Sequence, residues 1–395
     1  MTSSLKNIKN LKGKRVLVRV DFNVALKKGK VLEESKIKAS LPTLQYLLKK
    51  KAKIILITHV GRPEGKVVPE LSVKPIAKVL SKMLKKKVKI VSDTNLTLPS
   101  PTRRGPLMSQ KPGEIVLLEN IRFFEGEEKN SDEFVRQIAS IADMFVLDGF
   151  AVAHRESASV TGVTKYLPSY AGFLVQKEIE GLNKILHKPK HPAVFIVGGA
   201  KIETKLPVIK NILKIADAVL VGGAIFNTYL KAKGYGVGAS LVDDGFEKEA
   251  ISTFSKKKIF KPIDVIVGDK KGKKVRVVEI EKTPHIICAG EEMILDIGPE
   301  TVKQFEKIIS KAKTLVWNGA MGFFEVPVYA NGTYEIVRAL VTKSHKGAYT
   351  VVGGGESILV LDQMNVKKKI TFVSTGGGAM LEYLSGKKLP GLKIL

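Results

Sequence analysis

The sequence predicts an α/β fold with two doubly wound parallel-sheet (Rossmann-like) domains joined by a hinge helix. The chain has 395 residues, more than a single hydrophobic core usually supports. Short β-branched runs alternate with amphipathic helical stretches from end to end, which is typical of parallel sheets covered by helices on both faces. The alternation begins a second time after about residue 165, which indicates a second sheet.

The first half holds five predicted strands. Helical stretches at Leu41–Lys51 and Phe134–Ile141 lie between them. The predicted strands are Arg15–Val20, Ile54–Thr58, Val88–Val91, Ile115–Leu118 and Met144–Leu147.

The second half holds six predicted strands. We expect them to form the second parallel sheet, since two sets of five or more strands would overfill one twisted sheet. They are Ala193–Val197, Ala218–Val221, Asp264–Val267, Thr314–Trp317, Tyr349–Val352 and Thr371–Ser374.

A proline and glycine break separates the two halves. The segment Tyr166–Gly172 is followed by a predicted helix from about Leu174 to His187, an arrangement that suits a hinge between domains. The alternative is an ordinary helix-to-strand connection within one large sheet. The expected boundaries are an N-terminal domain at 1–168, a hinge helix at 169–187, a C-terminal domain at 188–375 and a C-terminal segment at 376–395.

Composition excludes several classes of protein. Hydrophobic residues make up 44% and charged residues 26%, which argues against a disordered or fibrous chain. The single cysteine, Cys288, has no partner for an internal disulfide, and no apolar run reaches the roughly 18 residues of a membrane span. The first residues contain no apolar stretch typical of a signal peptide. We therefore expect a cytoplasmic protein that does not bind a membrane.

The charge is strongly positive, because 66 Lys and Arg residues face 38 Asp and Glu residues for a net charge of +28. A basic balance of this size favours a nucleic-acid partner as one interpretation. The excess is nearly all lysine, in scattered runs such as Lys85–Lys87 and Lys256–Lys258, without interleaved aromatic residues for base stacking. That distribution favours a solvated lysine-rich surface over a binding groove for nucleic acid.

Polar and charged residues follow the strands of the first half. Ligands of open parallel sheets bind beyond the carboxyl ends of the strands, so these positions are candidate contacts. The arginines are notable in a chain that otherwise favours lysine, because their planar fork suits bidentate contact with phosphate or carboxylate. Each could also form an ordinary surface ion pair; together they predict an anion pocket. The residues are Asp21, Asn23, His59, Arg62, Arg122 and Arg155.

Glycine clusters occupy the corresponding positions of the second half. Glycine lets the backbone approach a ligand closely, and a helix N-terminus offers N–H groups to phosphate. One such pair is usually a tight turn, whereas five in one half predict a nucleotide cleft. The clusters are Gly198–Gly199, Gly222–Gly223, Asn318–Gly319, Gly353–Gly355 and Gly376–Gly378.

Charged residues beside the glycine clusters could complete such a cleft. Lys201 and Lys205 lie four residues apart on one helical face and are candidate phosphate ligands. Glu356 could hold magnesium, which takes one or two carboxylates plus phosphate oxygens, or could serve as an ordinary first-turn acid. The Walker A motif, a zinc-type Cys/His cluster and Gly-x-Ser-x-Gly are absent from the sequence. An anion pocket combined with a nucleotide cleft indicates a kinase for a small anion.

Seven sequence blocks resemble the signature blocks of the phosphoglycerate kinase family, in the family's order and spacing over essentially the whole chain. They are Arg19–Val24 (RVDFNV), His59–Pro63 (HVGRP), Glu119–Phe123 (ENIRF), Gly198–Lys201 (GGAK), Leu295–Pro299 (LDIGP), Trp317–Gly322 (WNGAMG) and Ser374–Ala379 (STGGGA).

The resemblance implies a reaction and its ligands. It implies Mg²⁺-dependent, reversible phosphoryl transfer between ATP and 3-phosphoglycerate, with ADP and 1,3-bisphosphoglycerate as the other pair. It also implies a monomer without a specific nucleic-acid partner, a 3-phosphoglycerate-binding first domain, a nucleotide-binding second domain, and a C-terminal segment that packs back on the first domain.

The resemblance also implies site residues. The glycerate would be bound by Asp21, Asn23, Lys36, His59, Arg62, Arg122 and Arg155. The catalytic set would be Lys36, Lys201, Lys205, Gly376 and Gly377. The nucleotide would be bound by Gly199, Ala200, Lys201, Lys205, Gly222, Gly223, Asn318, Glu325, Gly354, Gly355, Glu356 and Ser357, and the metal by Glu356.

The chain departs from the family pattern at a few positions. Lys36 stands where the family has an arginine that reaches the transferring phosphoryl group, and Glu356 stands where it has a metal-binding aspartate. Ala320 replaces a usual proline, and Leu147 and Gly149 alter the block around Asp148. The alternative hypothesis is therefore a weakened relative that binds nucleotide or nucleic acid without catalysis. The enzyme is favoured by the joint retention of Asp21, His59, Arg62, Arg122, Arg155, Lys201 and Lys205.

Overall fold

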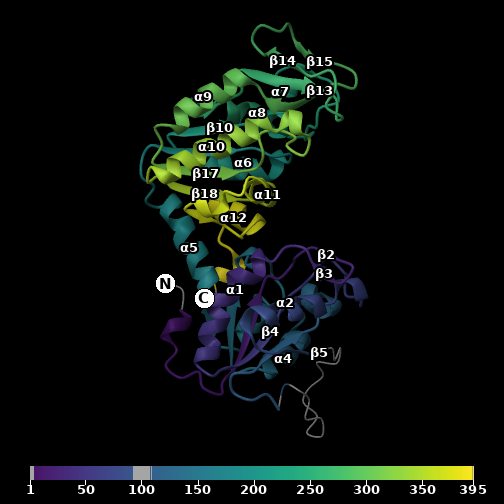
Figure 1. Ribbon diagram of the computed structural model, residues 1–395, viewed down its shortest axis with the longest axis vertical. Helices are drawn as coiled ribbons and strands as arrows, with labels where there is room; N and C mark the ends of the chain where they lie inside the picture. The colour runs from purple at the N-terminus through teal and green to yellow at the C-terminus, as the bar shows by residue number, and fades with distance from the viewer. Residues whose placement is uncertain (1–3, 92–106, 108, 394) are drawn as a thin grey trace. The chain divides into compact units, whose positions relative to one another are not determined.

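The computed structural model in Figure 1 describes residues 4–91, 107, 109–393 and 395. The chain forms two compact units: Met1–Glu180 with Lys388–Leu395 is unit 1, and Gly181–Lys387 is unit 2. Among the described residues, no helix combines the length and the apolar character needed to cross a membrane. The predicted α/β fold with two parallel sheets is confirmed.

The centre of unit 1 is a six-stranded parallel sheet with the strand order β5-β6-β4-β1-β7-β8. Its central strands are buried along nearly their whole length, because helices cover both faces. The strands are β1 (Arg15–Val20), β4 (Lys53–Ile57), β5 (Val88–Val91), β6 (Ile115–Leu118), β7 (Met144–Asp148) and β8 (Ser169–Ala171), with a separate hairpin of β2 (Leu26–Lys27) and β3 (Lys30–Val31).

Helix α1 (Ser35–Lys49) begins six residues before the predicted start at Leu41. Proline is best tolerated in the first turn of a helix, so Pro42 favours a start near Leu41, yet the structure accommodates Pro42 inside the helix. Lys36 is thereby placed in the first turn of α1. The other helices of unit 1 are α2 (Lys74–Leu84), α3 (Glu125–Lys129), α4 (Asp132–Ser140) and α13 (Pro390–Lys393), with 3₁₀ turns η1 (Leu5–Asn7), η2 (Pro69–Leu71), η3 (Ile121–Phe123), η4 (Phe150–Val152) and η5 (Gly162–Lys165).

Unit 2 is built on a second six-stranded parallel sheet, with the order β12-β10-β9-β17-β18-β19. Its core includes Trp317, Phe305 and Leu220, all fully buried. The strands are β9 (Ala193–Val197), β10 (Ala218–Val221), β12 (Ile259–Phe260), β17 (Thr314–Asn318), β18 (Tyr349–Gly353) and β19 (Phe372–Val373). The helices are α6 (Ile202–Ile212), α7 (Ala224–Ala232), α8 (Glu247–Phe254), α9 (Pro299–Ile309), α10 (Asn331–His345), α11 (Gly355–Gln363) and α12 (Gly378–Leu384), with η6 (Pro327–Tyr329) and η7 (Lys367–Lys369).

One predicted strand of the second sheet belongs elsewhere. The segment predicted at Asp264–Val267 is β13 (Asp264–Gly268), which pairs antiparallel with β14 (Arg276–Glu279) and β16 (Met293–Ile297). A short apolar run has the same appearance in a parallel or an antiparallel pair, so its partners cannot be inferred from the run itself. The edge of the parallel sheet is occupied by β12, and a further pair is formed by β11 (Gly236–Val237) and β15 (Ile286–Cys288).

The division between the units falls inside helix α5 (Phe173–Leu186), after Glu180. Within the segment 376–395, the structure makes a second division after Lys387. Helix α12 stays with unit 2, where the Asn211 side chain donates to the Leu384 carbonyl at 2.8 Å. The last residues belong to unit 1, where the Gly391 N–H donates to the Ala153 carbonyl at 2.8 Å.

A fully buried carboxyl group, Asp148, lies at the end of β7 in unit 1. Its Oδ1 accepts hydrogen bonds from Thr43 Oγ1 of α1 at 2.7 Å and from the Leu174 N–H of α5 at 3.0 Å. Burial raises the pKa of Asp148 to about 7. A raised carboxyl pKa contributes stability that is fully present below the unfolded pKa near 3.8 and is lost as the pH rises through about 7.

Asp148→Asn is expected to remove this pH dependence. The amide keeps an acceptor for Thr43 and Leu174 and cannot ionise, so the variant should gain stability relative to wild type between pH 5 and pH 8. The expected relative gain is about 2–3 kcal/mol, because wild type loses about 1.4 kcal/mol for each pH unit between the two pKa values. Chemical denaturation of both proteins at the two pH values measures it. An equal stability difference at pH 5 and pH 8 would contradict this role of Asp148.

Candidate active site

The charged residues predicted for the anion pocket follow four neighbouring strands of unit 1. Asp21 follows β1, His59 follows β4, Arg122 follows β6 and Arg155 follows β7. These strands stand side by side in the order β6-β4-β1-β7 and run parallel, so their carboxyl ends meet at one edge of the sheet. The structure therefore brings the predicted residues to one edge.

Arg19 was not among the predicted site residues, yet its buried side chain contacts groups at this edge of the sheet. It is 2% exposed within β1, one residue before the strand ends, and its Nη1 donates to the Val20 carbonyl at 2.8 Å. Its Nη2 lies 3.2 Å from His59 Nδ1. Burial lowers the pKa of Arg19, and the opposing charge of Glu127 is the strongest of the interactions that raise it. Glu127 is itself buried, accepting from the N–H and hydroxyl of Ser159 at 2.9 and 2.7 Å.

This contact assigns the proton on His59. Burial, and then the neighbouring cations led by Arg19 and Arg122, hold the pKa of His59 well below its usual value, so the ring is neutral. Arginine donates and never accepts, and His59 Nδ1 must therefore be the acceptor. The remaining proton sits on Nε2. His59 can thus donate one hydrogen bond to an anion without adding charge.

Lys36 reaches the same edge from α1. Its Nζ lies 2.7 Å from Asp21 Oδ2, while Asp21 Oδ1 accepts from the Asn23 N–H at 3.3 Å. The Asp21 side chain is 8% exposed and that of Lys36 is 31% exposed. The ammonium is therefore held at the pocket by a carboxylate that also belongs to it.

Arg122 and Asn23 hold the loop that carries Arg62. Arg122 Nη1 donates to the Gly61 carbonyl at 2.7 Å and its Nε pairs with Glu128 at 3.1 Å, while Asn23 Oδ1 accepts from the Gly61 N–H at 3.0 Å. In the part of the chain that the structure describes, neither Arg62 nor Arg155 forms a side-chain ion pair or hydrogen bond. These two guanidinium groups are the cations best available to an added anion.

The glycine clusters of unit 2 also converge. They follow β10, β9, β17, β18 and β19, which are consecutive neighbours in the parallel sheet. Three of these loops approach one another closely at Gly223, because a Cβ there would lie 2.7 Å from the Ala320 carbonyl oxygen and 2.8 Å from the Gly199 nitrogen. Gly223 also has a φ of +67°, which side chains rarely adopt. Glycine is therefore required there by both space and backbone conformation.

Lys205 is a buried cation at this edge of the sheet. It is 7% exposed, and its Nζ donates to Asn318 Oδ1, while Asn318 Nδ2 donates to the Gly353 carbonyl at 2.6 Å. Burial lowers the pKa of Lys205 to about 8, although the Glu356 carboxylate opposes the shift. Lys201 is exposed at the N-cap of α6, whose first N–H, on Ile202, donates to Asp243 Oδ2 at 2.7 Å.

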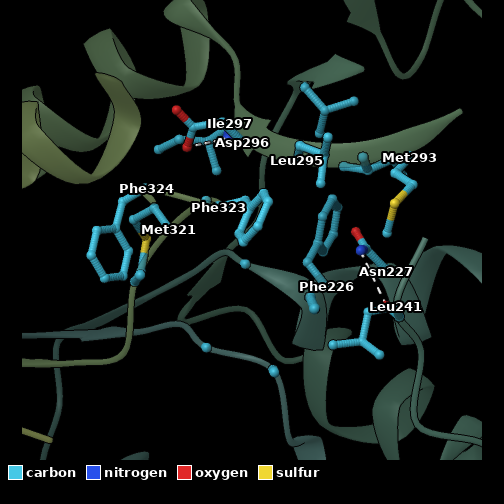
Figure 2. Close-up of a pocket in the computed structure, with 18 of the residues that line it drawn as sticks. Phe226, Asn227, Leu241, Met293, Leu295, Asp296, Ile297, Met321, Phe323 and Phe324 are labelled. Carbon is cyan, nitrogen blue, oxygen red and sulfur yellow. Dashed lines mark hydrogen bonds between the residues drawn. The ribbon is translucent and has the colours of Figure 1, made fainter. Parts of the chain in front are cut away.

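A cavity of about 450 Å³ opens from the glycine loops (Figure 2). Five predicted nucleotide residues line it: Gly199, Ala200, Gly223, Glu325 and Glu356. The rest of its wall is largely apolar and was not predicted, since the residues come from separate segments with no shared motif. This apolar group includes Phe226, Leu241, Met293, Leu295, Phe323 and Phe324.

Other predicted nucleotide residues lie outside that cavity. Ser357 is fully buried, and its hydroxyl accepts from the Gly319 N–H at 2.8 Å, so it supports a loop of the cleft. Gly222 is buried against Met321, and Gly354 is the N-cap of α11, where it borders Asn318. Gly355 begins α11. Of the two glycines predicted as catalytic, Gly376 donates its N–H to Ser374 Oγ at 3.1 Å. Gly377 is the N-cap of α12.

Comparison with known proteins identifies the family. The family model described as phosphoglycerate kinase matches residues 5–387. The chain is 43% identical over 393 residues to the phosphoglycerate kinase of Pelotomaculum thermopropionicum, covering 98% of this chain and 97% of that one. It is 44% identical over 399 residues to that of Moorella thermoacetica, covering 99% and 98%.

The chain belongs to the phosphoglycerate kinase family. The solved structure of phosphoglycerate kinase from Coxiella burnetii superposes with a TM-score of 0.86 at 38% identity, covering all of this chain and 98% of that one. The structure of the enzyme from Pyrococcus horikoshii gives a TM-score of 0.84 at 32% identity, with the same coverage. The predicted resemblance to the phosphoglycerate kinase family is thus confirmed.

Proposed function

We propose that this chain catalyses the reversible transfer of a phosphoryl group between ATP and the carboxylate of 3-phosphoglycerate, giving ADP and 1,3-bisphosphoglycerate. The observation that carries the proposal is that one chain of the phosphoglycerate kinase family holds both an arginine-rich anion pocket and a glycine-lined cavity, each at the carboxyl edge of a parallel sheet. These are the two ligand environments that the reaction needs.

In the proposed glycerate site, charge and directed hydrogen bonds have separate roles. Arg62 and Arg155 would bind the phosphate of 3-phosphoglycerate, since they have no ion-pair partner among the described residues. Arg122 adds positive charge while holding the Gly61 loop. His59 would donate from Nε2, and Asp21 and Asn23 would accept from or orient the glycerate hydroxyl group. Lys36 would neutralise the carboxylate or the arriving phosphoryl group.

In the proposed nucleotide site, the backbone contributes most of the contacts. Gly199, Ala200 and Gly223 would admit the phosphates close to the main chain, and Gly354 and Gly355 would do so at the start of α11. Glu325 lines the cavity and would bind the ribose. Lys201 and Lys205 would neutralise the phosphates, and Gly376 and Gly377 would lie against the transferring group.

Asn318 and Ser357 would act through their neighbours in this site. Asn318 positions Lys205, and Ser357 holds the Gly319 loop. Gly222 has no side chain and would therefore leave space for the same loop at Met321. These roles follow from the hydrogen bonds and close packing of the three residues.

Magnesium fits the donor chemistry of this cavity. The described residues contain no cluster of three or more His, Cys, Asp or Glu side chains suited to a metal. Magnesium bound with nucleotide needs only one or two carboxylates, because phosphate oxygens and water complete its shell. Glu356 is an exposed carboxylate that lines the cavity beside Gly199 and Lys205. Glu356 would hold the ion, which would neutralise phosphate charge when bound.

The remaining parts of the proposal concern the protein's surroundings. A monomer in the cytoplasm, without a specific nucleic-acid partner, accords with a single buried cysteine and with lysines spread along the chain. The two relatives named above carry the name of the enzyme and give no support to a non-catalytic nucleic-acid-binding role.

A coupled assay tests the function. The chain is supplied with 3-phosphoglycerate, MgATP, glyceraldehyde-3-phosphate dehydrogenase and NADH, and NADH oxidation reports 1,3-bisphosphoglycerate formation. We expect turnover that depends on both substrates and on Mg²⁺. If neither this chain nor Lys36→Arg turns over, the non-catalytic alternative is favoured.

A further inference from the structure

Asn227 is a buried polar side chain among the apolar residues of the unit 2 cavity, and its hydrogen bonding is incomplete. Asn227 lies on α7, is 2% exposed and lines the cavity. Its Nδ2 donates to the Leu241 carbonyl at 3.2 Å. The dashed line in Figure 2 marks this bond.

The hydrogen bond to Leu241 determines which atom of the Asn227 amide has no hydrogen-bond partner. A flipped amide would set the Asn227 oxygen against the Leu241 oxygen, so the observed orientation is the favourable one. Asn227 Oδ1 is buried and has no hydrogen-bond partner among the described residues. A buried acceptor without a partner is unfavourable, and a ligand that donates an N–H to it is bound more tightly in consequence.

The surroundings of Asn227 indicate which part of a nucleotide would supply that N–H. Near the glycine loops, the cavity is lined by Gly199, Ala200 and Glu356, which suit phosphates and metal. Figure 2 shows Asn227 in the part of the cavity formed by Phe226, Leu241 and Met293. Flat apolar surfaces suit a nucleobase, so the base would lie beside Asn227. This step rests on the function proposed above.

We propose that Asn227 is a specificity determinant for the nucleotide, and that its Oδ1 accepts a hydrogen bond from the exocyclic 6-amino group of adenine. This amino group carries the only N–H donors of the adenine base in ATP or ADP. The chain therefore prefers purine nucleotides with a 6-amino group over those without an N–H donor on the base. A purine nucleotide that lacks the group leaves Asn227 Oδ1 unpaired in the complex.

Purine riboside 5′-triphosphate is the probe for this preference, because it differs from ATP by replacement of the 6-amino group with hydrogen. With 3-phosphoglycerate and Mg²⁺, we expect wild type to show a kcat/KM about tenfold higher for ATP than for the probe, the size of effect typical of one hydrogen bond to a buried group. In Asn227→Leu we expect most of the preference for ATP to be lost. The ratio of kcat/KM for ATP to kcat/KM for the probe should then lie within about twofold of one.

Thr228→Val is the matched control on the same helix. Thr228 is buried beside Asn227, its hydroxyl accepts from the Asp243 N–H at 3.0 Å, and it is not among the residues that line the cavity. Its replacement disturbs the same part of α7 without touching the proposed acceptor. We expect the ratio of the two kcat/KM values to stay as in wild type.

Two results would overturn the role of Asn227: equal use of ATP and the probe by wild type, or an unchanged ratio in Asn227→Leu. A chain that turns over neither triphosphate contradicts the proposed function instead. In that case, and also if Asn227→Leu fails to fold, calorimetry tests the role of Asn227 without turnover. It compares the dissociation constants of ADP and of purine riboside 5′-diphosphate for wild type. Tighter binding of ADP supports this role, and equal dissociation constants overturn it.

Discussion

Lys205→Met is expected to lower kcat for phosphoryl transfer by at least about 100-fold, the effect typical of removing one preorganised charge or donor from a transition state. Lys205 is 7% exposed and is held by Asn318, so its charge is fixed in place before substrate arrives. Methionine fills similar space without the charge. Steady-state kinetics with saturating 3-phosphoglycerate and MgATP measures the loss.

The matched control is Lys210→Met, the same substitution on an exposed position of the same helix, α6. We expect its kcat to stay within about twofold of wild type, since exposed charges contribute little. A Lys205→Met variant that keeps a kcat within about threefold of wild type would show that Lys205 is not part of the catalytic machinery.

The pH dependence of the stability and activity of wild type provides a second test of the role of Lys205. Its pKa of about 8 lies below the unfolded value near 10.5, so the folded protein binds this proton less tightly than the unfolded chain. Stability from this group is therefore gained as the pH rises from about 8 to 10.5. Activity should move in the opposite direction, because deprotonation removes the charge that the phosphates need.

Lys36→Arg is expected to raise kcat several-fold, and Lys36→Met to lower it by about 100-fold. Lysine keeps the charge but lacks the planar fork with which arginine contacts two oxygens at once. Lys36 already lies 2.7 Å from Asp21 Oδ2, so an arginine there could keep this ion pair and still present a second N–H to the phosphoryl group. Transition-state arginines in phosphoryl transfer are worth roughly 10³ or more in rate.

Lys38→Arg provides the control for Lys36→Arg. Lys38 lies on the same helix, and its exposed side chain pairs with Glu34 at 2.9 Å outside the anion pocket. This variant should leave kcat unchanged. If Lys36→Arg leaves kcat unchanged or lowers it, Lys36 is not a weakened replacement for a catalytic arginine.

The sheets could be predicted well where a strand is a short, mostly apolar run between polar turns. The predicted bounds of β1, β5, β6, β9 and β10 match the structure, because strands of a parallel sheet covered on both faces are rich in β-branched and other apolar residues. The prediction was wrong for β13, whose run at Asp264–Gly268 has the same character but pairs antiparallel with β14 and β16. Pairing partners depend on segments distant in sequence.

The candidate site could be predicted where it follows from the rule for strand ends. Asp21, His59, Arg122 and Arg155 were predicted in this way, and the order β6-β4-β1-β7 explains why they lie at one edge of the sheet. Arg19 was missed because it lies inside a strand, where a charged residue is normally assigned to the surface.

The apolar part of the nucleotide cavity could not be found by the same rule. Phe226, Leu241, Met293 and Phe323 come from four separate segments and meet only in the folded chain. Asn227 carried no signal in the sequence either, since the unpaired state of its Oδ1 is a property of the folded structure.

The most direct test of the central claim is to trap the acyl phosphate. The chain is incubated with 3-phosphoglycerate and MgATP in the presence of hydroxylamine, which converts an acyl phosphate to a stable hydroxamate. We predict that hydroxamate and ADP accumulate in equal amounts with wild type, and that Lys205→Met forms at least about 100-fold less per unit time. ADP formation without hydroxamate, or neither product with wild type and Lys36→Arg alike, would contradict phosphorylation of the carboxylate by this chain.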